Sequence, residues 1–424
     1  MESLNKIDNA VQQKNMNRFL IGILIFSISI NFFSDFLSNK VMFILLVTGV
    51  AMASYNWVKL ASWVNVSNWY LRISISLLIL WELYIVCHGF IFQLPFIWDH
   101  LFTDNRALSY LLPFAVFLPV TNAVFLQKTF NFVYKLGVAF LVLLPFLLFY
   151  ILDDQDFAEQ YVWILGCSCG FILLTFFYHS RKRVIVAFVV MFLSLFIITI
   201  MARRNIMFTC ACFLVVSLLI IPLFNKNITI VKKGLFIFSF VTVVYLGFNF
   251  FVSNETGMFQ KITKRATSDT REEVFILYFL DMSDKDWIVG KGLNGTYFCP
   301  GIDKQWSGGE DPAHRDLDDR VYIENGFLQL ILNGGIIYLV LYMLVLVPAI
   351  VLGLFLSRNL LSKGCAILIL LFILDMVPFG LPTFSFRHFI VWFCVAICFS
   401  RKMRLMGDEE ISELLQPVEP EIKS

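Results

Sequence analysis

Six arginines carry the strongest chemical signal in this chain. They are Arg203, Arg204, Arg265, Arg271, Arg320 and Arg387. Each lies in a polar turn, in one long polar stretch, or near the start of an apolar segment. A guanidinium group holds phosphate through two parallel hydrogen bonds, and charge at a membrane edge is a functional candidate by default. The arginines therefore predict an anion-binding site. The alternative is structural: a side chain that extends to the membrane interface, or a local salt bridge.

Glu324 is the candidate general base. It follows Arg320 and leads directly into an apolar helix predicted from residue 327, so we expect it at the boundary between membrane and water. A carboxylate at such a boundary suits a base that takes a proton from a hydroxyl group. The alternative is that Glu324 only interacts with the dipole at the start of the helix.

Three further polar residues are weaker candidates: Asn325, Lys291 and His314. Lys291 lies between glycines, but the spacing GxxxxGK[ST] of a nucleotide phosphate loop is absent, so nucleotide binding is rejected. His314 is a common type of general base, but it lies in the acidic, glycine-rich segment 303–319. That segment has the character of a mobile lid, and its acidic residues lack the order of a calcium-binding loop.

The composition places these residues in a polytopic membrane protein. Of 424 residues, 59% are hydrophobic and only 15% are charged, against about a quarter in soluble domains. Apolar runs of about 17–25 residues match a hydrocarbon core of about 30 Å. Twelve such runs predict an all-α fold, near residues 19–37, 41–59, 71–91, 108–127, 131–152, 160–179, 184–202, 206–224, 233–252, 327–356, 363–380 and 384–400.

The distribution of Lys and Arg predicts the orientation. Short connections on one side carry most of the basic residues, which places both termini in the cytoplasm and the long polar loop outside. In a bacterial inner membrane, outside means the periplasm. We expect four regions: spans one to nine in 1–252, a periplasmic loop with a short amphipathic helix in 253–326, spans ten to twelve in 327–402, and a disordered cytoplasmic tail in 403–424.

Three motifs follow one another along the chain. Arg203 and Arg204 end one span and head the next, in Ala202-Arg203-Arg204-Asn205. Arg271 precedes a glycine-rich turn, Val289-Gly-Lys-Gly, and Glu324-Asn-Gly opens an apolar helix that contains Gly-Ile-Ile. With a large outer loop before the last three spans, this order resembles the O-antigen ligase and O-antigen polymerase family of bacterial membrane glycosyltransferases, which are GT-C-like.

The resemblance implies an enzyme of polysaccharide biosynthesis. Both its glycan donor and its acceptor would be linked to undecaprenyl diphosphate in the lipid bilayer, and a chain-length regulator is a further candidate partner. Nucleic acid, cofactors and metal ions are not expected. The diphosphate would be clamped by Arg203, Arg204 and Arg271, together with Arg265 and Arg387. Glu324 would take the proton of the attacking hydroxyl, and Arg320 would orient it or add positive potential for the diphosphate. In-line displacement would invert the anomeric centre.

Two alternatives remain open. Ligases of this family transfer the glycan to lipid A–core to complete lipopolysaccharide, and they typically carry His where this chain has Glu324. The glutamate therefore favours a polymerase that makes O-antigen, capsular polysaccharide or exopolysaccharide. The other alternative is a flippase or transporter of lipid-linked glycans, which Asp375, Pro378 and Pro382 favour because transporters contain charged or broken helices. The large asymmetric loop and the lack of a two-fold repeat favour an enzyme.

Overall fold

The chain folds as an all-α membrane protein. The computed structural model describes residues 2–31, 39–94, 97, 106–201, 203–224, 271–299, 319–378 and 384–415. Within these ranges, five helices are long and apolar enough to cross a membrane. They are Phe43–Leu60, Trp69–Gly89, Ala123–Asp153, Arg181–Ile200 and Gly326–Phe355. The predicted number of twelve spans is not confirmed, and the predicted span at 233–252 lies outside the described residues.

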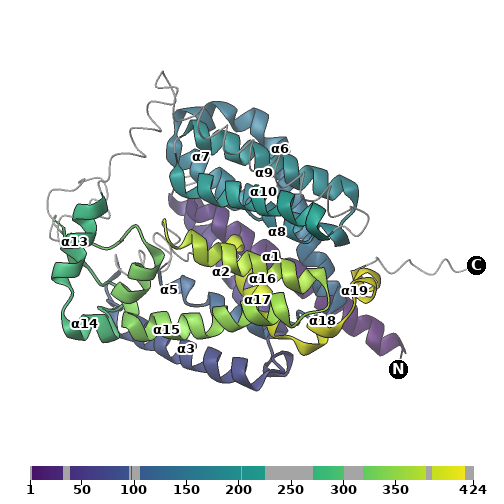
Figure 1. The fold of residues 1–424 in the computed structure, drawn as a ribbon, viewed down its shortest axis with the longest axis horizontal. Coiled ribbons are helices and arrows are strands. Elements are labelled where there is room, and N and C mark those ends of the chain that lie inside the picture. The colour runs from purple at the N-terminus through teal and green to yellow at the C-terminus, as the bar shows by residue number, and fades with distance from the viewer. Residues whose placement is uncertain are drawn as a thin grey trace, which may run out of the picture.

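The elements are numbered as in Figure 1. The long helices are α1 (Glu2–Asn31), α2 (Asn39–Leu60), α3 (Trp69–Gly89), α6 (Ala123–Asp153), α9 (Arg181–Ile200), α10 (Arg204–Phe224), α15 (Gly326–Phe355), α16 (Leu360–Asp375) and α17 (Phe386–Phe399). The shorter helices are α5 (Arg106–Ser109), α7 (Gln155–Tyr161), α8 (Cys169–Leu174), α13 (Arg271–Asp281), α14 (Asp284–Val289), α18 (Arg401–Leu405) and α19 (Asp408–Leu415). Helical turns η1 (Trp63–Asn65), η3 (Leu112–Phe117), η4 (Val162–Gly166) and η5 (Phe176–Tyr178), and strands β1 (Tyr297–Phe298) and β2 (Asp319–Arg320), complete the set.

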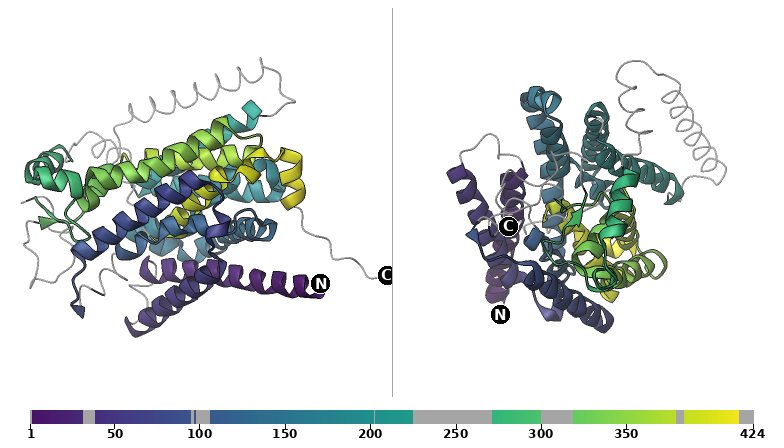
Figure 2. Two further views of the ribbon diagram at one scale, coloured as in Figure 1. Left: turned by 90° about the horizontal axis from the view of Figure 1, so that it is seen from below. Right: turned by 90° about the vertical axis from the view of Figure 1, so that its left-hand side faces the viewer.

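The helix α17 forms the centre of the bundle. Every residue from Phe386 to Phe399 is buried, Arg387 and His388 included, because neighbouring elements enclose this mostly apolar helix. It packs against α15, α16 and the turn η3. At one edge of the bundle, α1 and α2 lie side by side (Figure 2). The central position of α17 matters for function, because Arg387 near its start is thereby held inside the protein.

Two predicted spans are not continuous helices. The segment 108–127 contains the 3₁₀ turn η3 and then a turn in which Asn122 N donates to Pro119 O at 3.0 Å, until Asn122 caps α6. The segment 160–179 is divided among the end of α7, a π-helical turn, α8 and η5. Irregular backbone at membrane depth is tolerated where protein encloses it. Here the carbonyl of Phe117 accepts hydrogen bonds from Ser62 N at 3.0 Å and Asn65 Nδ2 at 2.7 Å.

We call the unit formed by α13, α14, the sheet of β1 and β2, and the first turns of α15 the outer domain, because it lies at one end of the helix bundle (Figure 1). The strands are antiparallel, with Tyr297 opposite Arg320. Tyr278 and Tyr297 are buried in its small hydrophobic core, together with Val274, Met282, Cys299, Ile323, Ile331 and Leu332. Figure 1 shows α13 and α14 at one end of the bundle, while α18 and α19 lie at the opposite end.

Candidate functional site

The start of α15 is joined to the end of α16. Asn325 caps α15, since its side-chain oxygen accepts from Phe327 N at 3.0 Å and Leu328 N at 3.1 Å. Its Nδ2 donates to Val377 O at 3.1 Å, and Gly326 N donates to Met376 O at 2.7 Å. Asn325 therefore has a structural role that links two helices. The link also brings Glu324, one residue earlier, beside the end of α16, where Asp375 lies.

Asp375 pairs with Arg387 inside the protein. Arg387 Nη2 forms an ion pair with Asp375 Oδ2, and Thr209 donates its hydroxyl to Asp375 Oδ1. The side chains of Arg387 and Asp375 are only 9% and 2% exposed. The guanidinium also lies 5.2 Å from the ring centre of Trp163, a cation–π geometry. Charges this deep are stable only when paired, so Asp375 accounts for the burial of Arg387.

One nitrogen of Arg387 is left over. Nη1 is buried and has no hydrogen-bond partner among the described residues. Arg387 also lines a mostly apolar cavity of about 20 Å³ between α8, α10, α16 and α17. That volume holds about one water molecule. The free N–H groups of Arg387 can therefore hydrogen-bond a small acceptor, such as a water or one oxygen of a ligand.

Arg203 obtains its anion from another loop. It forms ion pairs with Asp156 and, at 3.3 Å, with Glu159, both in α7. Burial raises the pKa of Glu159, while the charge of Arg203 opposes that rise. Glu159, Asp375 and Arg387 all interact electrostatically with Cys167, so the two arginine sites are neighbours. The turn itself has no acidic residue, and the partner Asp156 comes from 47 residues earlier in the chain.

Arg320 and Glu324 lie in the outer domain. Arg320 is 7% exposed, in the strand β2, and both residues interact electrostatically with Tyr297. Burial raises the pKa of Tyr297, and Arg320 opposes that rise. Glu324 is half-buried. The structure thus brings Arg320, Glu324 and Arg387 to the same end of the bundle. Arg320 lies in β2, Glu324 precedes α15, and Arg387 pairs with Asp375 at the adjoining end of α16.

The other predicted arginines are placed only in part. Arg271 begins α13 and Arg204 begins α10, but the positions of their side chains are not described. Arg265 and His314 lie outside the described residues.

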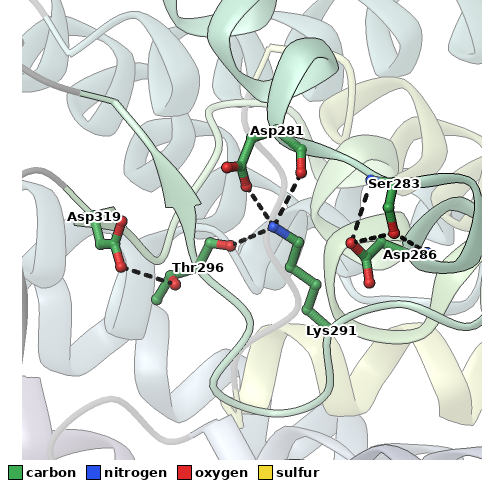
Figure 3. Close-up of polar contacts among 6 residues, drawn as sticks. All are labelled: Asp281, Ser283, Asp286, Lys291, Thr296 and Asp319. Carbon is green, nitrogen blue, oxygen red and sulfur yellow. Dashed lines mark hydrogen bonds and ion pairs between the residues drawn. The ribbon is translucent and has the colours of Figure 1, made fainter.

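Lys291 is held by the outer domain itself (Figure 3). Its ammonium group forms an ion pair with Asp281 and donates to Thr296 O at 3.0 Å and Asp281 O at 3.4 Å. The neighbouring Asp319 accepts from the Thr296 hydroxyl at 3.3 Å. Because its donors are occupied, Lys291 connects α13 to β1 and has no donor directed at a ligand. This agrees with the absence of a nucleotide phosphate loop.

The glycine-rich turn closes a break in α15. Gly335 has φ +70°, which interrupts the helix and frees carbonyl groups before it. Lys291 N donates to Leu332 O at 2.7 Å, and Gly292 N donates to Asn333 O at 2.9 Å. Trp81 Nε1 donates to Gly334 O at 2.8 Å. We call this arrangement, the Gly335 break with residues 290–293 and Trp81, the Gly335 clasp.

The clasp leaves no space for a side chain at its centre. A Cβ atom on Gly335 would lie 2.0 Å from the carbonyl oxygen of Ile288. Gly290 has φ +74°, and a Cβ there would lie 2.4 Å from Gly334 N. The motif Val289-Gly-Lys-Gly thus serves close backbone packing. It positions the outer domain on the bundle.

Glu82 is a buried acid that the sequence analysis missed. It lies in α3, is 3% exposed, and its Oε1 accepts from the hydroxyl of Tyr338 at 3.1 Å. Among the described residues its Oε2 has no hydrogen-bond partner. The signal was present, because Glu82 is the one acidic residue in the apolar run 71–91 and such residues are functional candidates. Tyr338 follows the Gly335 break by three residues, so Glu82 lies just below the outer domain.

Comparisons with known proteins assign no family. No protein-family model matches the chain, and no curated protein sequence matches it. In the ranges that the structure describes, no three His, Cys, Asp or Glu side chains are close enough together to hold a metal ion.

Proposed function

We propose that this protein polymerises lipid-linked oligosaccharide repeat units at the outer face of a bacterial inner membrane. The donor and acceptor are glycans on undecaprenyl diphosphate. In this proposal both termini are cytoplasmic, the outer domain is periplasmic, and the segments between and around the five long helices complete twelve spans. The resemblance of the three motifs to the O-antigen polymerase and ligase family is one support for it.

The observation that carries the proposal is the position of Glu324 relative to Arg387. The hydrogen bonds from Asn325 and Gly326 to Val377 and Met376 hold Glu324 beside the end of α16. Asp375, which pairs with Arg387, directly precedes Met376 in the chain. In this proposal Glu324 serves as the base and Arg387 as a cation for the diphosphate, two roles that glycosyl transfer from a diphosphate can use.

Each residue has a defined part in the proposed reaction. Glu324 takes the proton of the acceptor hydroxyl, and that oxygen bonds to the anomeric carbon of the donor. The bond from this carbon to the diphosphate oxygen breaks, and its electron pair leaves with the diphosphate. Arg387, together with Arg203, Arg204 and Arg271, stabilises the developing negative charge. Asp375 is a positioning residue, because it holds Arg387 in place without touching substrate.

A reconstituted reaction tests the proposal. Purified protein in detergent receives a lipid-linked repeat unit as the only substrate, and the products are sized on a gel. We expect a ladder of longer lipid-linked glycans, lost in Glu324→Gln and Arg271→Ala. The matched control is Lys285→Ala, which removes an exposed basic residue of the same domain and should leave the ladder intact. If the wild type transfers glycan only after lipid A–core is added, the protein is a ligase.

A flippase is a second candidate function, and Glu82 favours it. A carboxyl group buried among apolar helices, close to the break at Gly335, resembles the sites of transporters, where broken helices surround a charged residue. Liposomes containing the protein test this function, by measuring how fast a lipid-linked glycan becomes accessible to an external lectin. Wild-type rates equal to those of empty liposomes would exclude it.

A further inference from the structure

A polar cavity lies at the end of the bundle opposite the outer domain. It has a volume of about 320 Å³ and is bounded by α6, η5, the start of α9 and α19. Its polar lining is formed by Gln127, Asn131, His179, Ser180, Arg183 and Ser412. Binding sites for small ligands have volumes of about 300–1,000 Å³, so this cavity is large enough for a phosphate group and part of its substituent.

The cavity is positively charged. No carboxylate is among its described lining residues. Arg183 donates to Asn131 Oδ1, and its guanidinium lies 5.5 Å from the ring centre of Tyr134. In the described part of the chain Arg183 forms no ion pair. The helix α19 carries four acidic residues, none of which is among the lining residues of the cavity: Asp408, Glu409, Glu410 and Glu413. Asp408 accepts hydrogen bonds from the Tyr178 hydroxyl and from Leu360 N at 2.7 Å, and Glu410 accepts one from Gly407 N at 2.8 Å.

The start of α9 adds positive potential to the same cavity. Ser180 is its N-cap residue, but among the described residues the Ser180 side chain accepts no capping hydrogen bond. The first N–H groups of a helix have no partner within it, and the positive end of the helix dipole favours an anion. Arg183 lies in this first turn. The helix end and the guanidinium therefore act on one cavity.

We propose that this cavity binds a phosphate group, carried by an anionic lipid or present as free phosphate, with Arg183 as its principal contact. The helix α19 covers the site, since Ser412 and Leu415 line it. Gln127 Nε2 donates to Leu414 O at 3.1 Å, which fastens the end of α19 to α6. Bound phosphate therefore stabilises the docked position of α19. This site is independent of the proposed glycosyl transfer, because it lies at the other end of the bundle.

The test measures phosphate binding by the full chain and four variants. Melting temperature in detergent is followed at constant ionic strength while inorganic phosphate replaces chloride. A parallel series uses lipid nanodiscs of phosphatidylcholine with increasing phosphatidylglycerol. Arg183→Ala removes the contact, and Lys182→Ala removes an adjacent exposed charge as its control. Ser412→Glu puts a negative charge into the cavity without altering Arg183, and Ser412→Gln is its uncharged control.

We expect a saturable rise in melting temperature for the wild type and both controls. The apparent dissociation constant should increase at least about tenfold in Arg183→Ala and Ser412→Glu, because charge-assisted hydrogen bonds are lost. Saturation by inorganic phosphate identifies a site for the free ion, whereas saturation by phosphatidylglycerol alone identifies a lipid headgroup site. The proposal is overturned if neither ligand gives a saturable effect, or if all four variants bind as the wild type does.

Discussion

The buried pair of Asp375 and Arg387 allows stability and chemistry to be separated. Asp375→Asn leaves the charge of Arg387, whose side chain is 9% exposed, without its partner. Arg387→Gln leaves the charge of Asp375, whose side chain is 2% exposed, without its partner. Breaking a buried ion pair in this way costs about 3–5 kcal/mol, or roughly a factor of 10² to 10³·⁵ in the unfolding equilibrium. Replacing both, as in Asp375→Leu with Arg387→Met, should restore most of that stability, because an apolar pair of similar volume removes the unpaired charge.

The assay compares melting temperature in detergent with glycan transfer for the two single variants and the double variant. We expect both single variants to melt at lower temperature and the double variant to melt close to the wild type. Transfer should stay absent in the double variant, since the free N–H groups of Arg387 are gone. A double variant that is folded and retains transfer within about twofold would show that Arg387 is purely structural. Single variants as stable as the wild type would refute the burial argument itself.

Three further predictions concern the clasp, the outer domain and Glu82. Gly335→Ala should reduce the free energy of unfolding by about 1–3 kcal/mol or more, because of backbone strain and steric overlap, and so lower the melting temperature. Gly407→Ala is the control and should leave the melting temperature unchanged, because a Cβ atom there meets nothing within 4 Å. Burial raises the pKa of Tyr278 and Tyr297 above 10.0. The unfolded chain therefore loses these protons at a lower pH than the folded protein does, and the free energy of unfolding should fall as pH rises past about 10, by up to about 1.4 kcal/mol per pH unit for each tyrosine. Melting temperatures recorded across this pH range measure the fall. Glu82→Leu should destabilise by about 1–3 kcal/mol, measured by thermal melting, and Glu82→Gln by less, because only the leucine leaves a buried hydroxyl unpaired.

Composition and periodicity were sufficient for the fold class. Apolar runs at 71–91, 131–152 and 184–202 became α3, α6 and α9, because such a run buries its backbone hydrogen bonds only as a helix. They were insufficient at 108–127, where hydropathy alone does not reveal that η3 and the turn after it interrupt the helix. Pro113, at the start of η3, was the local sign of that difference.

The sequence predicted which residue types the candidate site contains, but not which residues pair with one another. Arg203 and Arg387 were identified, but their partners Asp156 and Asp375 come from other helices, and pairing over such separations is decided by tertiary packing. Lys291 and Asn325 were candidates for ligand contact, and hydrogen bonds within the protein occupy both. Glu82 lies far from the polar loop in sequence, and its signal is that of a lone acid in an apolar run.

The Gly335 clasp also constrains the order in which the chain can assemble. Asn294 Nδ2 bonds to Gly89 O, 205 positions earlier, and Trp81 bonds to Gly334, 253 positions later. The turn at 290–293 cannot form its contacts until α3 and α15 both stand in the membrane, and α15 leaves the ribosome long after α3. During synthesis, therefore, the turn at 290–293 can pack against the bundle only after α15, one of the last helices, has been inserted. A truncation before residue 326 would leave α13, α14 and the turn at 290–293 without the helix against which they pack.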